Sequence, residues 1–223
     1  MKQEKGRIAA FFDFDKTLLT TDSAALGLRF LWELGLLPGP YIAKVLFANI
    51  FYQRHLISDE AMADILLTFY KDKRLDPFVD SRCEFYQYKV KPRLSKNLLE
   101  RLRMHQQAGH VTVLLSGALR YSLEPVMADL KMNHLLCSEL EVGEDGLLTG
   151  RTKGPLCVKK AKAAMALNLA CEQGIDLARS HAYGDHQSDL DILSMVGYPY
   201  AVQPTKPLLK IARQRGWPVL KHS

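Results

Sequence analysis

Two aspartates, Asp13 and Asp15, stand one residue apart directly after an apolar run at residues 8–12. A short apolar run of this kind is typical of a buried parallel strand. Carboxylates held this close at a strand end repel each other unless a cation or a shared proton offsets their charge. The pattern therefore indicates a site in which these groups serve as metal ligand, nucleophile or base.

A second pair of aspartates, Asp185 and Asp189, follows a short apolar run at residues 181–183. The carboxyl ends of parallel strands meet at one edge of a sheet, so we expect all four carboxylates to lie together. Such a cluster needs positive charge, and a hard cation with oxygen ligands, Mg²⁺, supplies it most economically. A nearby lysine would add more, and the candidates are Lys159, Lys160 and Lys162.

Ser116 and Gly117 follow another apolar run, residues 111–115. A hydroxyl and backbone N–H groups at a strand end can donate to an oxyanion such as phosphate. Alone, this dipeptide is typical of an ordinary turn. Only the polar residues at the other strand ends favour a role in phosphate binding. Together the groups suit phosphoryl transfer through an aspartyl-phosphate, in which one aspartate attacks phosphorus and its neighbour acts as acid and then base.

The elements that must position these groups alternate between strand and helix from about residue 91 onward. The alternation predicts an α/β fold, a Rossmann-like doubly wound parallel sheet with right-handed crossovers. The expected strands after the first are residues 111–115, 135–137, 181–183 and 198–202. An Asp-Gly turn at residues 145–146, between two short alternating runs, predicts a β-hairpin.

Residues 22–90 contain no convincing strand. Four helical stretches are expected there instead, at residues 24–37, 41–56, 58–70 and 76–88. A connection of this length is improbable as a loop and indicates a domain of its own. The sequence thus predicts an α/β core from residues 1–21 and 91–223 and a helical cap from residues 22–90, with a hinge near residues 20–23.

Composition excludes several classes of protein. The formal charge is +6, but basic residues are mixed with acidic and apolar ones, so we expect a solvated surface and no nucleic-acid partner. The four cysteines show no close-spaced pair and indicate reduced thiols in a cytoplasmic protein. Asp13 interrupts the N-terminal apolar run too early for a signal peptide. The apolar stretch 41–52 contains Lys44 and is too short for a membrane span.

The motifs DFDKT, LLSG, a downstream lysine and GDHQSDLDIL, in this order, resemble the haloacid dehalogenase superfamily of phosphatases. The match covers nearly the whole chain. The insertion after the first motif resembles the cap of the phosphoserine-phosphatase-like subfamily, group IB, as do the GPLC segment and the ending WPVL. The resemblance implies a Mg²⁺-dependent hydrolase of phosphomonoesters whose cap closes over the site.

The same resemblance gives each residue of the first two motifs a role. Asp13 would be the nucleophile and Asp15 the general acid and base. Thr17 and Ser116, with Gly117, would contact the phosphoryl group. Asp13 and Asp15, the latter through its backbone carbonyl, would also be ligands of Mg²⁺.

The later motifs complete the site that the resemblance implies. Asp185 would be the third Mg²⁺ ligand, and Asp189 would orient the metal site. Lys162 sits where the subfamily usually has its catalytic lysine. Lys159 and Lys160 remain alternatives, since one turn of helix separates the candidates.

Three positions depart from the pattern of the family. Lys16 stands where the superfamily commonly has glycine, and Ser188 stands where phosphoserine phosphatases tend to have asparagine. Phosphoserine phosphatases carry a cap-side glutamate nine residues after the nucleophile, where this chain has the shorter Asp22. Asp22 is therefore a candidate substrate contact, but phosphoserine itself is a weaker assignment.

Several functions remain open at this point. A small soluble phosphorylated metabolite, phosphoserine-like or other, is the favoured substrate. The apolar stretch 41–52 motivates a lipid-phosphate alternative and would allow peripheral membrane contact, for which the sequence holds no other support. A phospho-acceptor signalling module combines similar residues, but such domains are about half this length and lack the insertion. A non-catalytic, purely binding member is a further alternative.

Overall fold

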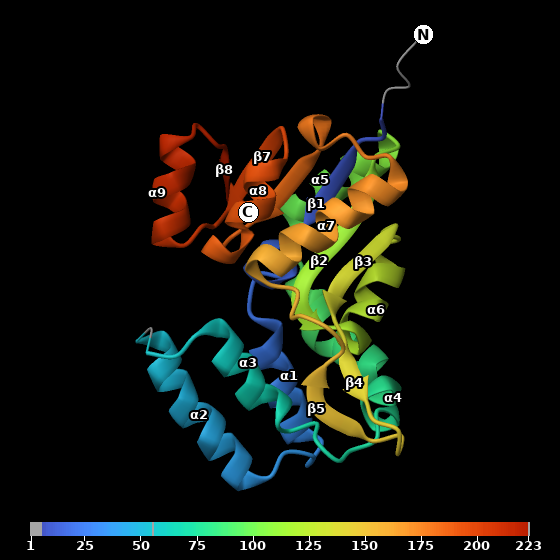
Figure 1. The fold of residues 1–223 in the computed structure, drawn as a ribbon, viewed down its shortest axis with the longest axis vertical. Helices are drawn as coiled ribbons and strands as arrows, with labels where there is room; N and C mark the ends of the chain where they lie inside the picture. Colours follow the sequence, from blue (N-terminus) through green and yellow to red (C-terminus); the bar gives the residue numbers. More distant parts are fainter. Residues whose placement is uncertain (1–5, 55, 223) are drawn as a thin grey trace.

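This computed structural model describes residues 6–54 and 56–222. A six-stranded sheet forms the centre of its α/β part (Figure 1). Its strands are β1 (Ala9–Phe12), β2 (Val111–Leu119), β3 (His134–Ser138), β6 (His181–Gly184), β7 (Tyr198–Val202) and β8 (Val219–Leu220). They run in the order β3-β2-β1-β6-β7-β8, and every neighbouring pair is parallel. The predicted parallel α/β fold is thereby confirmed.

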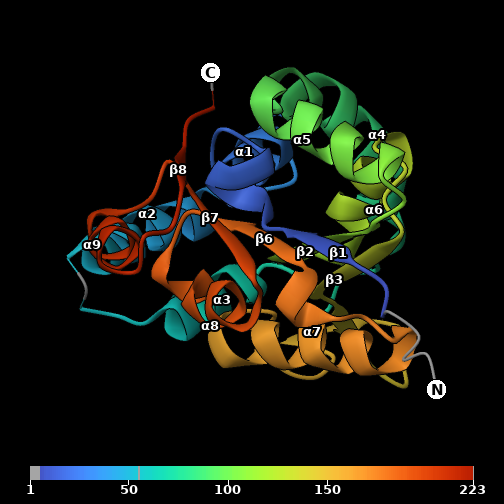
Figure 2. The ribbon, with the colours of Figure 1, turned by 90° about the horizontal axis from the view of Figure 1, so that it is seen from above.

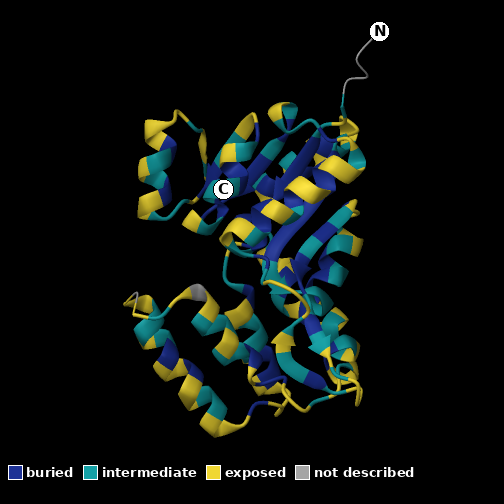
Figure 3. Ribbon diagram, in the orientation of Figure 1, coloured by how far each residue is buried: buried dark blue, intermediate teal, exposed yellow. Residues whose placement is uncertain are grey.

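Helices cover both faces of this sheet (Figure 2). One face carries α5 (Lys96–Gln107) and α6 (Arg120–Asp129), and the other carries α7 (Lys159–Gln173) and α8 (Leu190–Met195), with α9 (Lys206–Gln214) beside the β7–β8 edge. Strand β1 is central: Ala10 and Phe12 belong to the core on the first face, and Ala9 and Phe11 to the core on the second. Burial on both sides explains why this strand is uniformly apolar, and Figure 3 shows β1 and β2 buried.

The inserted segment is helical, as the sequence predicts. It comprises α1 (Ser23–Glu33), α2 (Gly39–Gln53), α3 (Asp59–Leu67) and α4 (Asp76–Phe85), and continues through the short turns η2 (Tyr86–Val90) and η3 (Lys91–Arg93) back into the sheet layer. The first helix ends earlier than the expected residue 37. Gly35, at φ +71°, adopts the left-handed conformation that commonly terminates helices.

The predicted hairpin is present as β4 (Leu140–Val142) and β5 (Leu148–Thr152), which pair antiparallel. It packs on the helical insertion (Figure 1). Leu140 and Leu148 share a hydrophobic cluster with Leu67 and Phe78, and Leu148 exchanges backbone hydrogen bonds with the turn after α3. The apolar side of the hairpin is thus buried by the insertion, a contact that sequence order does not reveal.

One strand differs from its prediction in a way that matters for the site. We expected β2 to end at residue 115, with Ser116 and Gly117 after it, and this was wrong. The strand continues to Leu119, with a shift of register between Ser116 and Leu119, which pair with Cys137 and Ser138 of β3. Such irregularities redirect side chains near functional sites, and here the shift falls at the residues expected to contact phosphate.

None of the helices in the described part of the chain is long and apolar enough to cross a membrane. The four cysteines are free thiols: Cys83 and Cys171 are exposed, and Cys137 and Cys157 are buried.

Candidate active site

The ends of β1 and β6 bring three carboxylates together. Asp13 directly follows β1, and its backbone N–H donates to the carbonyl of Tyr183 in β6 at 2.9 Å, which ties the two strand ends side by side. Oxygen atoms of Asp13, Asp185 and Asp189 all lie within 4.8 Å of one another, and all three residues are largely or fully buried. The predicted meeting of the two motifs at one sheet edge is therefore observed.

Lys162 is the lysine that reaches this cluster. Its Nζ donates to Asp13 Oδ1 and to Asp189 Oδ1, each at 2.5 Å, and the residue is only 3 % exposed. Lys159 and Lys160 are exposed on the first turn of α7, and Lys159 pairs with Glu60 of α3 at 3.0 Å. The three candidate lysines lie on different faces of α7, and among them only Lys162 faces the sheet.

Asp189 also holds the loop that presents Asp185. Its Oδ2 accepts the backbone N–H groups of Asp185 at 3.2 Å and His186 at 3.1 Å. A Cβ on Gly184 would lie 2.7 Å from this carboxylate, so the close approach requires glycine. The expected role of Asp189, to orient the metal site, stays a prediction with which these contacts are compatible.

The charges in this cluster do not balance. Burial raises the pKa of Asp13 to about 7 and that of Asp185 to about 8. Burial alone would lower the pKa of Lys162, but Asp13 and Asp189 more than offset this effect and keep it protonated. Three acidic groups with hard oxygen donors thus face one buried ammonium, which fits a divalent cation as the missing positive charge.

Asp15, the fourth carboxylate expected here, lines the same cleft as the other three, and its side chain also contacts the start of α1. Its Oδ1 accepts the backbone N–H of Ser23, the first residue of α1, at 2.5 Å. Burial raises the pKa of Asp15 to about 6, and the negative charge of Asp22 adds to this shift. A pKa near the working pH suits a group that gives and later takes a proton.

The turn after β1, residues Phe14–Leu18, contains Lys16 and Thr17. Lys16 adopts φ +55°, a left-handed conformation that glycine adopts without strain. The Lys16 charge acts on Asp185 and lowers its pKa, although burial outweighs this effect. Thr17 Oγ1 is fully buried and has no hydrogen-bond partner among the described residues. A buried hydroxyl without a partner is unfavourable, and a phosphoryl oxygen would satisfy it.

Ser116 and Gly117 lie on β2, and Gly117 lines the cleft that holds the carboxylates. Ser116 Oγ accepts the backbone N–H of Ala118 at 3.1 Å, which leaves its hydroxyl hydrogen able to donate to a ligand. Gly117 contacts the loop before α7, where a Cβ would lie 3.0 Å from Val158 Cγ1.

Two cavities meet at these residues. An open cleft of about 1120 Å³ holds the carboxylates and Lys162, and a smaller cavity of about 310 Å³ lies within the helical insertion. They share four lining residues: Asp15, Gly117, Leu156 and Val158. A molecule in the smaller cavity would therefore meet the carboxylate cluster beside Asp15.

The smaller cavity is mainly apolar and aromatic. Its larger side chains include Phe30, Leu31, Tyr41, Tyr70, Phe78 and Phe85. Asp22 lines it as predicted, while its Oδ1 also caps α1 through the N–H groups of Ala24 and Ala25. Arg82 lines it as well; the sequence could not single it out among the arginines of the insertion.

Sequence reasoning missed the contribution of α6 to this cavity. Tyr121 and Ser122, at the start of α6, line it together with the residues of the insertion. The Tyr121 hydroxyl lies 2.7 Å from that of Tyr70, so α6 and the helical insertion are in contact at the cavity wall. The irregular end of β2 directs α6 toward the insertion, and only this feature could have indicated that α6 lines the cavity.

The family model of haloacid dehalogenase-like hydrolases matches residues 10–194. Phosphoserine phosphatase SerB1 of Mycobacterium tuberculosis is 30% identical over 218 residues, which cover 95% of this chain and 70% of that protein. Histidinol-phosphatase of Neisseria meningitidis is 29% identical over 221 residues, which cover 95% and 97%. A crystal structure of a protein of unknown function from Bordetella pertussis superposes with a TM-score of 0.87 at 25% identity, covering 98% and 100%.

These similarities extend over the sheet, the insertion and the motifs that form the carboxylate cluster. They set aside the two non-hydrolytic alternatives that the sequence left open, the signalling module and the purely binding member. The chain belongs to the haloacid dehalogenase-like hydrolase family, and it is a phosphoric monoester hydrolase.

Proposed function

We propose that this enzyme is a Mg²⁺-dependent phosphatase that hydrolyses small phosphomonoesters through an aspartyl-phosphate on Asp13. The observation that carries this proposal is the buried pair of Asp13 and Lys162 beside Asp185 and Asp189. Lys162 occupies Asp13 Oδ1, which leaves Oδ2 free to react. An oriented carboxylate next to fixed positive charge is suited to nucleophilic attack on phosphorus.

The two aspartates divide the chemistry between them. Asp13 Oδ2 forms a bond to phosphorus as the ester P–O bond breaks, and protonated Asp15 gives its proton to the departing alkoxide. Asp15, now a carboxylate, takes a proton from water. The resulting hydroxide attacks the aspartyl-phosphate and releases inorganic phosphate, which restores Asp13. The pKa of Asp15, about 6, lets it serve in both steps near neutral pH.

The remaining groups hold the phosphoryl oxygens and the metal. Asp13, Asp185 and the backbone carbonyl of Asp15 would bind Mg²⁺, which when bound stabilises negative charge on the phosphoryl group. Thr17 and Ser116 would donate their hydroxyl hydrogens to phosphoryl oxygens. The unpaired Thr17 hydroxyl supports this role, because it otherwise has no partner among the described residues.

We further propose that residues 22–90 form the cap domain and select the substrate. A cavity of about 310 Å³ suits a small organic group, at the lower end of typical ligand pockets. Asp22 uses Oδ1 to cap α1, so its Oδ2 remains for a cationic group of the substrate. The names of the two bacterial relatives refer to phosphoserine and histidinol phosphate, both of which carry an amino group, and this agrees with our proposal.

A lipid phosphate is the second candidate substrate. Helix α2 exposes Leu46, Phe47 and Ile50, at 61 %, 64 % and 46 %, on the outside of the cap. An apolar outer face next to an apolar cavity would suit a substrate that is drawn from a lipid surface. The enclosed size of the cavity favours the small soluble substrate.

Hydrolysis of an aryl phosphate, with and without Mg²⁺ after treatment with a chelator, tests the reaction. We expect turnover that depends on Mg²⁺ and is restored when the ion is added back. Undiminished turnover in the chelator would overturn the metal assignment. A panel of amino-alcohol phosphates, uncharged phosphates and lipid phosphates tests the substrate class, and turnover confined to lipid phosphates would reverse our preference.

A further inference from the structure

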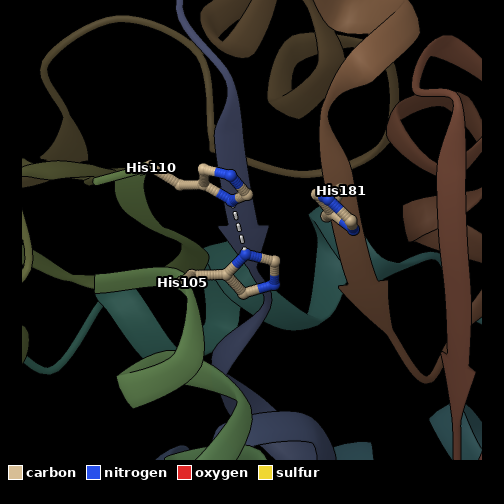
Figure 4. A group of neighbouring side chains, drawn as sticks. All are labelled: His105, His110 and His181. Atoms are coloured by element: carbon tan, nitrogen blue, oxygen red, sulfur yellow. Dashed lines mark hydrogen bonds between the residues drawn. The ribbon is translucent and has the colours of Figure 1, made fainter. Parts of the chain in front are cut away.

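Three histidines gather at the end of the sheet opposite to the carboxylates. His105 lies in the last turn of α5, His110 directly precedes β2, and His181 begins β6, whereas the reactive groups follow the strand ends. One ring nitrogen from each lies within 4.8 Å of the other two. Figure 4 shows the rings of His105 and His110 in contact and His181 across β1 from them.

The hydrogen bonds of this cluster leave one ring nitrogen, His181 Nδ1, without a partner among the described residues. His105 Nδ1 and His110 Nδ1 are 2.8 Å apart, so one of them donates its proton to the other. This proton must move to the Nε2 atom of the same ring before both Nδ1 atoms can bind a metal ion. His105 Nε2 lies 2.9 Å from the hydroxyl of Tyr183. His181 Nδ1 is buried and has no hydrogen-bond partner among the described residues. A buried polar atom in this state calls for an explanation.

The surroundings keep the rings fixed and neutral. His181 stacks on Tyr198 with a centroid distance of 4.8 Å and an angle of 19°. Ala10, which pairs with His181 in the sheet, has only a methyl group beneath the cluster. Burial lowers the pKa of His105 to about 4 and also lowers the pKa values of His110 and His181. Neutral imidazole is the form that binds metals.

We propose that His105, His110 and His181 bind one divalent transition-metal ion, preferentially Zn²⁺, at a site separate from the site of hydrolysis. Imidazole nitrogen suits Zn²⁺ and its first-row neighbours, whereas the carboxylates at the other end suit Mg²⁺. Three histidines and a water complete a tetrahedral site. Tyr183 would hold the His105 ring through the other nitrogen, as partners of metal-bound histidines commonly do.

The side chains must adjust to form the site. Zinc–nitrogen bonds of roughly 2.0–2.1 Å place tetrahedral ligand atoms about 3.3 Å apart. The 2.8 Å pair of Nδ1 atoms must therefore open slightly, and the more distant nitrogen must move inward. His110 and His181 are only partly buried, and an open hollow beside His110 gives an ion access.

The charges near the cluster limit its affinity. Positive charge on Arg101 acts on His105, and that on Arg179 acts on His110, although burial is the larger influence on both rings. Both guanidinium groups disfavour a dication. Binding should therefore be weaker than at a site balanced by carboxylates. Its effect would be to link α5 to β6 at the amino ends of the strands.

A Co²⁺ titration of metal-free protein, with the hydrolytic site saturated by Mg²⁺, tests this proposal. We expect the intense visible absorption of tetrahedral nitrogen-bound Co²⁺, which Zn²⁺ then displaces. His110→Asn and His181→Phe should each weaken Co²⁺ binding by at least about tenfold and abolish the absorption. His181→Phe keeps the stacking ring. His134→Asn removes a histidine outside the cluster and should behave as wild type.

A thermal shift gives an independent readout. Zn²⁺ should raise the melting temperature of the wild type and of His134→Asn, but not that of His110→Asn or His181→Phe, because a ligand stabilises only the state that binds it. Mg²⁺-dependent phosphatase activity equal to that of the wild type shows that a variant is folded. Wild-type protein without the tetrahedral absorption, or cluster variants that bind Co²⁺ as tightly as the wild type, would overturn the proposal.

Discussion

The ammonium group of Lys162 donates to the carboxylate of Asp13 at a distance of 2.5 Å, and both side chains are buried. The contact joins the first turn of α7 to the end of β1. Because Lys162 also reaches Asp189 at 2.5 Å, one cation links two of the three acidic groups in the cluster. The position and charge of Asp13, the proposed nucleophile, are thus influenced by a residue far from it in the chain.

Replacing the nucleophile should remove activity without unfolding the protein. Asp13→Asn keeps the shape of the side chain, and we expect turnover of an aryl phosphate to fall by more than about 10³-fold. The measurement is steady-state hydrolysis with Mg²⁺, with circular dichroism as the check on folding. Activity retained in a folded Asp13→Asn variant would exclude the proposed nucleophile.

Removal of the buried cation should affect both stability and rate. Lys162→Met leaves Asp13 and Asp189 buried next to each other, and breaking such a pair is destabilising by about 3–5 kcal/mol. Denaturant unfolding measures this loss, and activity should fall with it. Lys160→Met, on the exposed face of the same helix turn, is the matched control, with an expected change within about 0.5 kcal/mol. Equal effects of both substitutions would contradict the assignment of Lys162.

Asp22→Asn separates the two roles of this side chain. Asparagine still caps a helix, so α1 should remain stable. The lost negative charge should lower kcat/KM by about tenfold for an amino-alcohol phosphate and change it little for an uncharged aryl phosphate. Kinetics on the two substrates provide the comparison. A uniform loss on both would point to a structural role alone.

The ion pair between Glu60 and Lys159 connects the cap to α7 at 3.0 Å, with both side chains about half exposed. Exposed pairs contribute less than about 1 kcal/mol, and salt screens them. Glu60→Gln should therefore raise KM by less than about fivefold at low salt and not at all at high salt. An effect that persists at high ionic strength would show that Glu60 acts by other means.

The buried ring of His105 should make the fold sensitive to mild acid. Its pKa is lowered from the ordinary 6.5 to about 4, first by burial, so the unfolded chain takes up this proton before the folded one does. Stability is then complete above pH 6.5 and falls as pH drops toward 4, by at most about 3 kcal/mol.

Urea unfolding at several pH values, compared with His105→Gln, isolates this contribution. The wild type should lose more stability than the variant between pH 6.5 and 4, since glutamine carries no titratable ring. Parallel curves for the two proteins would show that the ring does not titrate on unfolding.

Much of the fold and the reactive cluster could be predicted because their signals are local. The apolar run before Asp13 and the Gly-Asp pair at residues 184–185 both indicate strand ends, and parallel strands bring such ends together. Spacing along one helix could not decide which of Lys159, Lys160 and Lys162 reaches the carboxylates. The face of α7 that packs on the sheet, visible only in three dimensions, distinguishes them.

The rest depends on contacts between distant segments. Tyr121 joins the cap cavity because β2 extends past Ser116 and redirects α6, which no local pattern announces. The hairpin is recognisable from residues 145–146, but its packing on the helical insertion is not. His105, His110 and His181 come from three elements, and nothing in their spacing indicates that they meet.

Strand β1 lies between β2 and β6, and both of these strands are synthesised much later than β1. In the sheet, Ala10 pairs with Thr112 on one side and with His181 on the other. During synthesis on the ribosome, the segment that bears Asp13 emerges first but lacks its second neighbour until residue 181 has left the exit tunnel. Such non-local pairing slows folding and leaves apolar edges open to aggregation. Truncated chains that end before β6 should therefore depend on chaperones, and hydrolysis should begin only after Asp185 and Asp189 have emerged.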